Sequence, residues 1–365
     1  MALGEPAHHE PAFGHARNEV FARLVECGFR SIVLESDRVA ALVVDDFVQD
    51  GVGSLDSAMR DGFSHWFGAL EANRDLVSWM REYNVGRPPE DRLAFHGMDA
   101  PLEFTAASPR SDLEYVRDYL GRDDDIASLA GDDERWSRTE AVSDPAESPG
   151  ETAEAMSLRA IADDMLTALY AQAPALIAGS SLSTWRRAEI HATSALGLLR
   201  YHRQAAQHIE DGARWSRLSG VRDVLMARNL LDIRDVESGR GPSLVFAHNI
   251  HLQRGQSRMR MAGMDLAWFG TGSIVASLLG ERFAFIPSCM GPGDGLFTEG
   301  TVPDASSEPG PDRASSWRLA AADAVDPTVE PTDAASAKDY YSLDEAVIDG
   351  ADAVLHVRKR TGSPA

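Results

Sequence analysis

Apolar positions in the first hundred residues follow two spacings. Residues 1–5 predict the stub of a strand, and residues 31–35 are a short apolar run that predicts a buried strand. Between them, residues 11–28 place apolar side chains three and four positions apart, which predicts a helix starting near Pro11 and ending at Gly28. Further helical patterns and a third strand follow, at 37–49, 54–68, 70–83 and 92–99. Alternating strands and helices are typical of a parallel sheet with crossover helices.

The pattern changes after Pro101. Long helical patterns without a convincing strand follow it, at 111–120, 151–173 and 184–237. Residues 121–150 are acidic and rich in Gly, Pro and Ser, and predict a loop. Strand patterns then return around a single helical one, at 243–249, 265–280 (the helix), 281–287 and 352–357. The two ends of the chain therefore both contain predicted strands, and its middle contains only predicted helices and a loop.

We expect an α/β fold in which a central, mostly parallel sheet is flanked by helices and a helical subdomain is inserted over the cleft. Residues 1–104 would form the first half of the α/β core, 105–240 the helical insertion or lid, and 241–365 the second half. Within that last part, residues 303–337 are rich in Pro, Ala, Ser and Asp, and a disordered loop is predicted there.

Composition narrows the class of protein. No stretch reaches 18 consecutive apolar residues, so no membrane span is predicted, and the first residues lack the features of a secretory signal, so we expect the cytoplasm. Cys27 and Cys289 are too few for a disulfide framework. The net charge of −22 argues against nucleic acid and anionic membranes as partners. It favours a neutral or cationic substrate. We also expect that substrate to be a largely apolar small molecule, and the oligomeric state stays unknown.

Three polar clusters directly follow predicted strands. Glu5 and His8 come after the first strand, Glu35 closes the second, and His248 and His251 follow a later one. Because the carboxyl ends of parallel strands meet at one edge, where ligands bind, we expect these side chains in one cleft. Histidine is the natural base for activating water at neutral pH, and Glu35 could orient His8 or act as the base itself. The HxxH pair could bind a metal or polarise a carbonyl.

Each cluster alone has an ordinary explanation. His8 could be a surface histidine, Glu35 could cap the next helix, and HxxH is common without function. Their coincidence at three strand ends favours a site. Arg17 could face the cleft and bind a carboxylate or carbonyl oxygen, and Asp99 could join from the third strand. By pattern alone, RDVLMARN (222–229) is an ordinary amphipathic helix end.

Several well-known motifs are absent from the sequence. It has no GxSxG elbow, no HExxH, no GxxxxGK[ST] and no GxGxxG after a strand. A serine nucleophile and a nucleotide cradle therefore have no support, and the histidine and carboxylate clusters stand alone.

Six segments, in order, resemble the erythromycin esterase family: LGEPAHHEPAF, RNEVFARLVECGFRSIVLES, WMREYN, FHGMDAP, RDVLMARN and HNIHLQR. The similarity runs from residue 3 to about residue 290, and six short motifs with fitting gaps are specific together. The family's motifs fall on Glu5 and His8 (GExxH), Arg17 (helix arginine), Glu35 (strand-end carboxylate), and His248, Asn249 and His251 (HNxH).

The resemblance implies a deep cleft between an α/β core and a helical subdomain, in which a macrolide lactone is hydrolysed by direct water attack without an acyl-enzyme. His8 would be the general base, with Glu35 and Arg17 organising His8 and the water, and His248 or His251 steadying the oxyanion. From the same motifs we expect Glu5 in the catalytic group and substrate contacts from four residues: Asp99, Arg222, Asn249 and His251. Family members are mostly described as metal-independent, so we expect no metal and no cofactor.

Three functions stay open. The first is hydrolysis of a carboxylic ester or macrolide-type lactone, as in antibiotic resistance. The second is a tailoring reaction of natural-product biosynthesis, such as acyl transfer, cyclisation or elimination, at the same site. The third is non-catalytic binding of a hydrophobic ligand, and the set of histidines and carboxylates argues against it because a binder needs only some of them.

Overall fold

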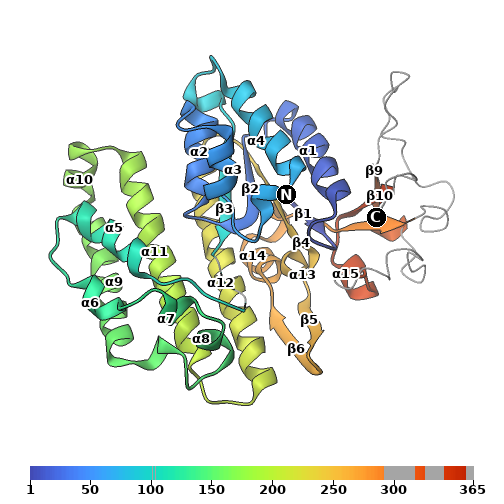
Figure 1. Ribbon diagram of the computed structural model, residues 1–365. Coiled ribbons are helices and arrows are strands. Elements are labelled where there is room, and N and C mark those ends of the chain that lie inside the picture. The colour runs from blue at the N-terminus through green and yellow to red at the C-terminus, as the bar shows by residue number, and fades with distance from the viewer. Residues whose placement is uncertain (101, 103, 292–316, 325–340, 359–365) are drawn as a thin grey trace.

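A five-stranded parallel sheet organises the fold (Figure 1). The computed structural model describes residues 1–100, 102, 104–291, 317–324 and 341–358. The strand order is β3-β2-β4-β1-β7. These strands are β1 (Ala2–Glu5), β2 (Ser31–Asp37), β3 (Ala94–Asp99), β4 (Ser243–His248) and β7 (Phe285–Ile286). The sheet and its flanking helices confirm the predicted α/β class.

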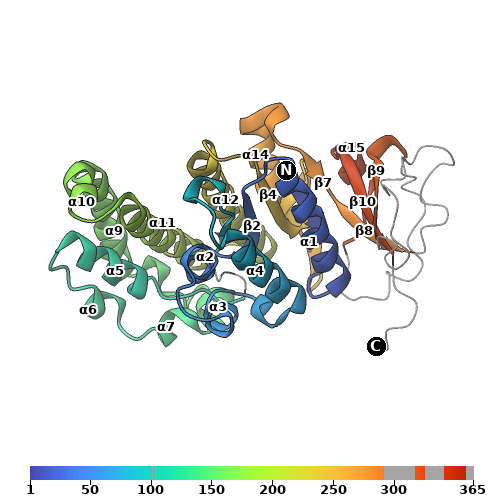
Figure 2. The same cartoon turned by 90° about the horizontal axis from the view of Figure 1, so that it is seen from above.

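Alternating side chains of the strands supply two cores, one on each face of the sheet. Leu3 and Ile32 pack on one face against α1 (Pro11–Glu26), α2 (Ala41–Asp50), α3 (Leu55–Asp61) and α4 (Glu71–Asn84). Ala2 and Val33 pack on the other face, against α12 (Asp211–Glu237) and α14 (Thr271–Leu279). Figure 2 shows these two helical layers on either side of the sheet.

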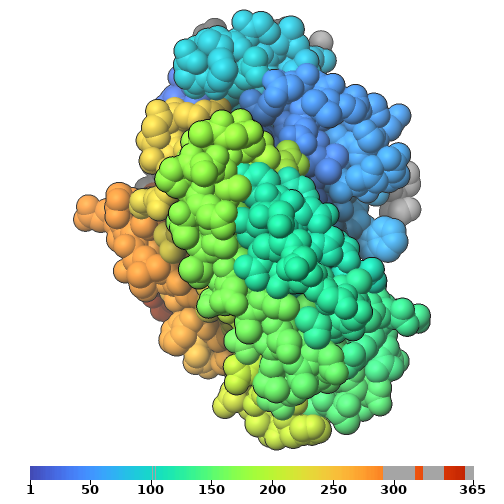
Figure 3. Space-filling view, turned by 90° about the vertical axis from the view of Figure 1, so that its left-hand side faces the viewer, coloured from blue at the N-terminus to red at the C-terminus, as the bar shows by residue number. Residues whose placement is uncertain are grey.

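The middle of the chain builds a helical body beside the sheet. Its helices are α5 (Arg110–Leu120), α6 (Ile126–Ala130), α7 (Glu134–Ser137), α8 (Glu140–Ser143), α9 (Ala153–Ala171), α10 (Ala173–Gly179) and α11 (Leu182–Ala205), and α12 leads back to the sheet. These helices enclose a core of their own around Trp136 and Leu158. Residues 121–150, predicted as a loop, contain three of the short helices. In Figure 3 this body, in green, forms most of the face toward the viewer.

Two smaller sheets complete the described chain. One has the order β8-β10-β9, with β8 (Ser288–Gly291), β9 (Trp317–Ala321) and β10 (Ala353–Arg358). The other is a hairpin of β5 (Gln256–Met261) and β6 (Met264–Phe269). The remaining helical turns are η1 (Phe67–Ala69), η2 (Pro89–Asp91), η3 (Pro149–Glu151), α13 (Asn249–Leu252), η4 (Gly280–Arg282), η5 (Ala322–Ala324) and α15 (Glu345–Asp349).

Two further expectations differ from the structure. Residues 265–280 are not one helix, because β6 buries alternate residues Leu266 and Trp268 before α14 begins. Most of 303–337, predicted as disordered, lies outside the described residues. Within it, residues 317–321 form β9 instead of disordered chain, because they pair with β10 and bury Trp317 in the core.

No described helix combines the length and the apolar character that crossing a membrane requires.

Candidate active site

The carboxyl ends of four parallel strands bring the predicted residues to one edge of the sheet. Glu5 of β1 is the register partner of His248 of β4. The pairing of β2 with β3 shifts between Leu34 and Asp37, so Glu35 falls in an irregularity of the strand. Such bulges re-aim side chains and are frequent next to active sites. Asp99 closes β3 at the same edge.

Glu5 and His8 form a hydrogen-bonded pair in the turn after β1. Nδ1 of His8 lies 2.9 Å from Oε1 of Glu5, so the ring donates its Nδ1 proton to the carboxylate. Its other nitrogen, Nε2, lies 3.7 Å from Oε1 of Glu35. The ring packs between Phe67 and His248, with centroid distances of 5.3 and 5.0 Å. His8 therefore presents Nε2 toward Glu35 in a fixed orientation.

Glu35 is the buried centre of the site. Its Oε2 accepts the backbone N–H of His248 at 2.7 Å. Its Oε1 lies 3.2 Å from Nη2 of Arg222 and 3.5 Å from Nε2 of His251. One carboxylate oxygen is thus approached by two imidazoles, those of His8 and His251, and by one guanidinium.

A second histidine–carboxylate pair faces the first. Nδ1 of His251 lies 3.0 Å from both carboxylate oxygens of Asp223, which is fully buried. Asp223 also accepts hydrogen bonds from the indole of Trp268 at 2.6 Å, and from the backbone and the hydroxyl of Thr271 at 2.7 Å each. His251 therefore donates its Nδ1 proton to a rigidly held carboxylate, which leaves Nε2 toward Glu35.

Asp223 is a residue that the sequence analysis did not single out. It stands three residues before Met226 and seven before Leu230, and all three are buried. A carboxylate on the apolar face of a helix needs a partner, because burying an unpaired charge is costly. That position in the periodicity of residues 211–237 was the signal that could have found it.

Arg222 and Asp99 bond to each other beside Glu35. Nε of Arg222 lies 3.2 and 3.1 Å from the two oxygens of Asp99, and Nη2 lies 2.6 Å from one of them. The guanidinium thus bridges the carboxylates of Asp99 and Glu35. His65 comes within 3.9 Å of Asp99 from the loop before η1. This geometry is that of groups that position Glu35.

His248 and Asn249 are tied to the backbone. Nδ1 of His248 accepts the amide of Ile250 at 3.2 Å, and Nε2 lies 3.1 Å from the carbonyl of Pro6. Burial, together with the neighbouring charge of His8, lowers the pKa of His248 to about 3, so this ring is neutral. Asn249 is fully buried and donates to the carbonyl of Ser288 at 3.0 Å.

Arg17 is almost wholly buried in α1 and has protein partners. It donates to Asn73 at 2.8 Å and to Asn18 at 2.7 Å. With Glu5 and Glu35 it lines a cavity of about 90 Å³. Burial lowers the pKa of Arg17 to about 10, so it keeps its positive charge at neutral pH.

The charges of the site shift one another's titration. Burial disfavours the imidazolium of His8, but the carboxylates of Glu35 and Glu5 outweigh it and raise its pKa to about 9. Burial also acts against the Glu35 carboxylate, yet the charges of His251, His8 and Arg222 hold its pKa well below the usual range. The pKa of His251 is raised by Asp223 and Glu35 against the effect of burial.

The backbone around the site includes unusual conformations. His9, next to His8, has φ of 64°, and His65 and Trp66 have φ of 56° and 63°. Left-handed conformations are uncommon for residues with a Cβ. Trp66 is also 87% exposed, which is unusual for a tryptophan. Within the described residues, no group of three or more His, Cys, Asp or Glu has the arrangement of a metal site.

Comparisons with known proteins place the fold and the family. No match was found among curated protein sequences. Three solved structures are similar, each with a TM-score of 0.63 over 98% of this chain. One is a Bacillus cereus protein, 16% identical, with 88% of that chain covered. The second is a mutant of the erythromycin esterase EreC in its open conformation, 19% identical, with 89% of that chain covered. The third is a succinoglycan biosynthesis protein, 16% identical, with 87% of that chain covered.

At these identities the structural likeness shows the fold alone. The family is shown by a different comparison, because the family model "Erythromycin esterase" matches residues 24–344, which include Glu35, Arg222 and the HNIH segment. The chain therefore belongs to the erythromycin esterase family, a family of hydrolases.

Proposed function

We propose that this protein hydrolyses a carboxylic ester, in particular a macrolide-type lactone, with water activated by His8 and without a covalent intermediate. The observation that carries the proposal is the convergence of two histidine–carboxylate pairs on one oxygen of Glu35. The match to the erythromycin esterase model supports the choice of substrate class. The substrate would be a neutral or cationic, largely apolar small molecule.

His8 is the group that takes the proton from water. Its bond to Glu5 keeps the proton on Nδ1, so the neutral ring has its lone pair on Nε2. The 3.7 Å from Nε2 to Glu35 is too long for a direct hydrogen bond, so Nε2 is free to contact a water placed beside the two groups. In the reaction, the water oxygen bonds to the carbonyl carbon, its proton passes to Nε2, and the carbonyl π electrons move to oxygen.

His251 stabilises the oxyanion that forms. Asp223 holds the Nδ1 proton of His251, and the raised pKa favours a second proton on Nε2. A charged N–H donor in a buried site stabilises a developing negative charge strongly. His248 is less suited to this role because backbone groups occupy both of its nitrogens.

Collapse of the tetrahedral intermediate completes the reaction. The carbonyl re-forms, the bond to the alcohol oxygen breaks, and the imidazolium of His8 gives its proton to that oxygen. Glu35 and Glu5 stabilise the imidazolium while it exists, as the raised pKa of His8 indicates. No side chain is acylated in this scheme, in accord with the absence of a GxSxG segment from the sequence.

The test is turnover of a macrolide lactone and of simple aryl esters by the full chain. We expect the lactone to give one product with the mass of substrate plus one water, each aryl ester to give an acid and a phenol, and both reactions to be about 10²–10⁴-fold slower after His8→Asn. Adding hydroxylamine in the assay should leave the product unchanged, whereas an acyl-enzyme would release a hydroxamate. A hydroxamate would refute direct water attack. A product lacking the added water, or joined to another alcohol, would assign the site to a tailoring reaction instead.

A further inference from the structure

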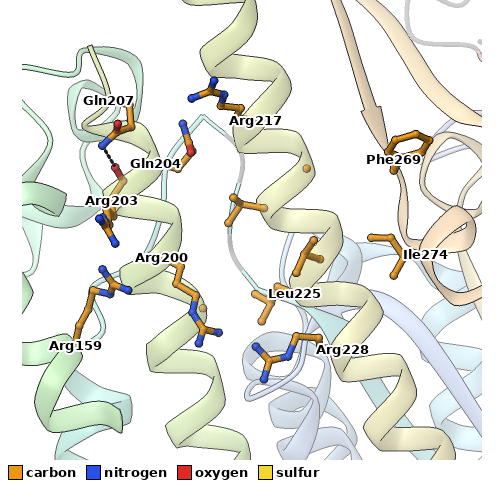
Figure 4. Close-up of a pocket in the computed structure, with 14 residues that line it drawn as sticks. Arg159, Arg200, Arg203, Gln204, Gln207, Arg217, Leu225, Arg228, Phe269 and Ile274 are labelled. Carbon is orange, nitrogen blue, oxygen red and sulfur yellow. Dashed lines mark hydrogen bonds between the residues drawn. The ribbon is translucent and has the colours of Figure 1, made fainter. Parts of the chain in front are cut away.

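A groove of about 810 Å³ lies away from the strand ends, between the helical body and α12. Helices α9, α11 and α12 form most of it, and the end of β6 and the start of α14 close the far side (Figure 4). Its volume falls in the range of small-molecule sites in proteins. Its basic lining residues are Arg159, Arg200, Arg203, Arg217 and Arg228.

The groove is positively charged, whereas the protein as a whole is negatively charged. The chain carries a net charge of −22, yet the groove is lined by five arginines and by no aspartate or glutamate. Across the described ranges, none of the five arginines forms an ion pair with a carboxylate. Glu151 accepts a hydrogen bond from the lining residue Gln207.

The arginines repel one another. Arg200 and Arg228 extend toward each other from α11 and α12 (Figure 4). The pKa of Arg200 is lowered by partial burial and then by the positive charges of Arg228 and Arg159, with Asp163 acting in the opposite direction. Like charges held together in this way are unfavourable unless an anion lies among them.

Two buried donors in the lining also lack partners. Nε of Arg159 and Nε2 of Gln204 are both out of contact with solvent and make no hydrogen bond within the described part of the chain. Most buried polar groups are hydrogen bonded, so unpaired donors call for a specific explanation.

The opposite side of the groove is apolar. Val221 and Leu225 of α12 line it together with Phe269 and Ile274. Phe269 is 61% exposed, and Val224, another lining residue, is also exposed. Exposed apolar groups gathered in a concave surface mark binding sites more often than isolated ones do. The groove thus offers a cationic half and an apolar half.

The groove and the candidate active site use opposite faces of α12. At 3.6 residues per turn, Arg217, Val221 and Arg228 project from one side of the helix. Arg222 and Asp223 project from the other side, toward Glu35 and His251. A ligand in the groove would not compete with an ester at Glu35.

We propose that the groove binds a small anionic amphiphile, a phosphate or sulfate ester on an apolar body. Arginine fits the oxygens of such groups with paired N–H donors, and several arginines match a group with three free oxygens better than one carboxylate. The apolar wall would hold the body of the molecule. This site does not depend on the proposed ester hydrolysis.

The test is calorimetric titration of the full chain with hexyl phosphate, hexanol and inorganic phosphate. We expect one hexyl phosphate per chain, weaker binding at higher salt, no binding of hexanol and weak binding of phosphate. The double variant R200Q/R228Q should bind at least tenfold more weakly. The matched variant R117Q/R234Q changes two surface arginines that pair with neighbouring aspartates, and should bind like the wild type.

Several results would overturn the proposal. Absence of binding, or equal loss in both double variants, would show that the groove arginines are not the determinants. If hexanol bound as tightly as hexyl phosphate, the apolar residues alone would account for binding. If inorganic phosphate bound as tightly as hexyl phosphate, the apolar residues would contribute nothing. If the chain bound only to vesicles that contain anionic lipids, the groove would be a membrane-binding surface instead. Thermal melts check folding, and the exposed Arg203→Gln is the fallback if the double variant unfolds.

Discussion

The carboxylate of Glu5 lies 2.9 Å from Nδ1 of His8, and this bond decides which ring nitrogen is free to act. The two residues are three apart in the sequence, in the turn that follows β1. Rotation of the turn by a single residue would present His9 in place of His8. The distinction between these two adjacent histidines is therefore the sharpest mutational test of the site.

Replacing His8 with Asn should lower kcat by about 10²–10⁴-fold, the usual range for general-base catalysis. Substrate affinity should change little, because the loss lies in the transition state. His9→Asn should cost far less, since His9 has no contact with Glu35 among the described ion pairs. Steady-state kinetics on any ester that the wild type hydrolyses would measure both. An essential His9 and a dispensable His8 would show that the register is wrong.

The rate should rise with pH. Because the pKa of His8 is about 9, most of the ring is protonated at neutral pH and only its neutral form accepts a proton. We expect kcat/KM for an uncharged ester to increase up to about pH 9 and then level off. Glu35→Gln removes the negative charge that raises this pKa, so the midpoint should move to lower pH while the plateau falls. A profile that is flat between pH 6 and 9 would contradict His8 as the base.

Asp223→Asn should impair both catalysis and folding. The variant removes the charge that raises the pKa of His251 and gives Thr271 a donor where it had an acceptor. Breaking one partner of a buried hydrogen-bonded charge pair costs roughly 3–5 kcal/mol. Denaturant melts and kcat would measure the two effects. Asp235→Asn on the exposed face of the same helix is the control. Wild-type kcat in folded Asp223→Asn would remove the Asp223–His251 pair from the mechanism.

The protein should lose stability in mild acid through His202. Burial lowers the pKa of His202 from 6.5 to about 4, and its ring bonds to the carbonyl of Ala107. The unfolded chain therefore takes up a proton below pH 6.5 that the folded chain refuses, so stability is complete above 6.5 and lost as pH falls toward 4. The loss should be about 3 kcal/mol. His202→Gln should flatten this dependence in denaturant melts relative to exposed His208→Gln; identical slopes would reject the assignment.

Activity should survive a chelator. The proposed steps use only His8, His251 and their carboxylates, so prolonged EDTA treatment should leave kcat unchanged. Loss of activity that one added divalent metal restores would replace direct water activation with metal-assisted hydrolysis.

The strand ends could be predicted from the sequence because buried parallel strands appear as continuous apolar runs. Apolar runs that stop at Glu5, Glu35 and His248 put those residues at one edge, and the structure brings them together there. The hairpin of β5 and β6 was missed because its apolar residues also fit a helical spacing. Its turn at Ala262 and Gly263, both with positive φ, carries the distinguishing signal.

Tertiary contacts explain what the sequence did not disclose about the site. The role of Asp223 depends on Trp268 and Thr271, which lie more than forty residues further along the chain. The pairing of Arg222 with Asp99 likewise joins two distant segments. Periodicity can locate a buried charge, but it does not say which partner neutralises it.

The left-handed residues His9, His65 and Trp66 have a consequence for protein engineering. A glycine at such a position removes the clash of its Cβ with the backbone, which is worth roughly 1–2 kcal/mol. A search for thermostable variants of this chain would therefore select glycine at these three positions first. His9 contacts the ring of His8, His65 contacts Asp99 and Phe67, and Trp66 directly precedes Phe67 in the chain, so the same substitutions would loosen the walls around the reacting groups. Heat resistance and turnover rate should compete in this one loop cluster before they compete elsewhere in the chain.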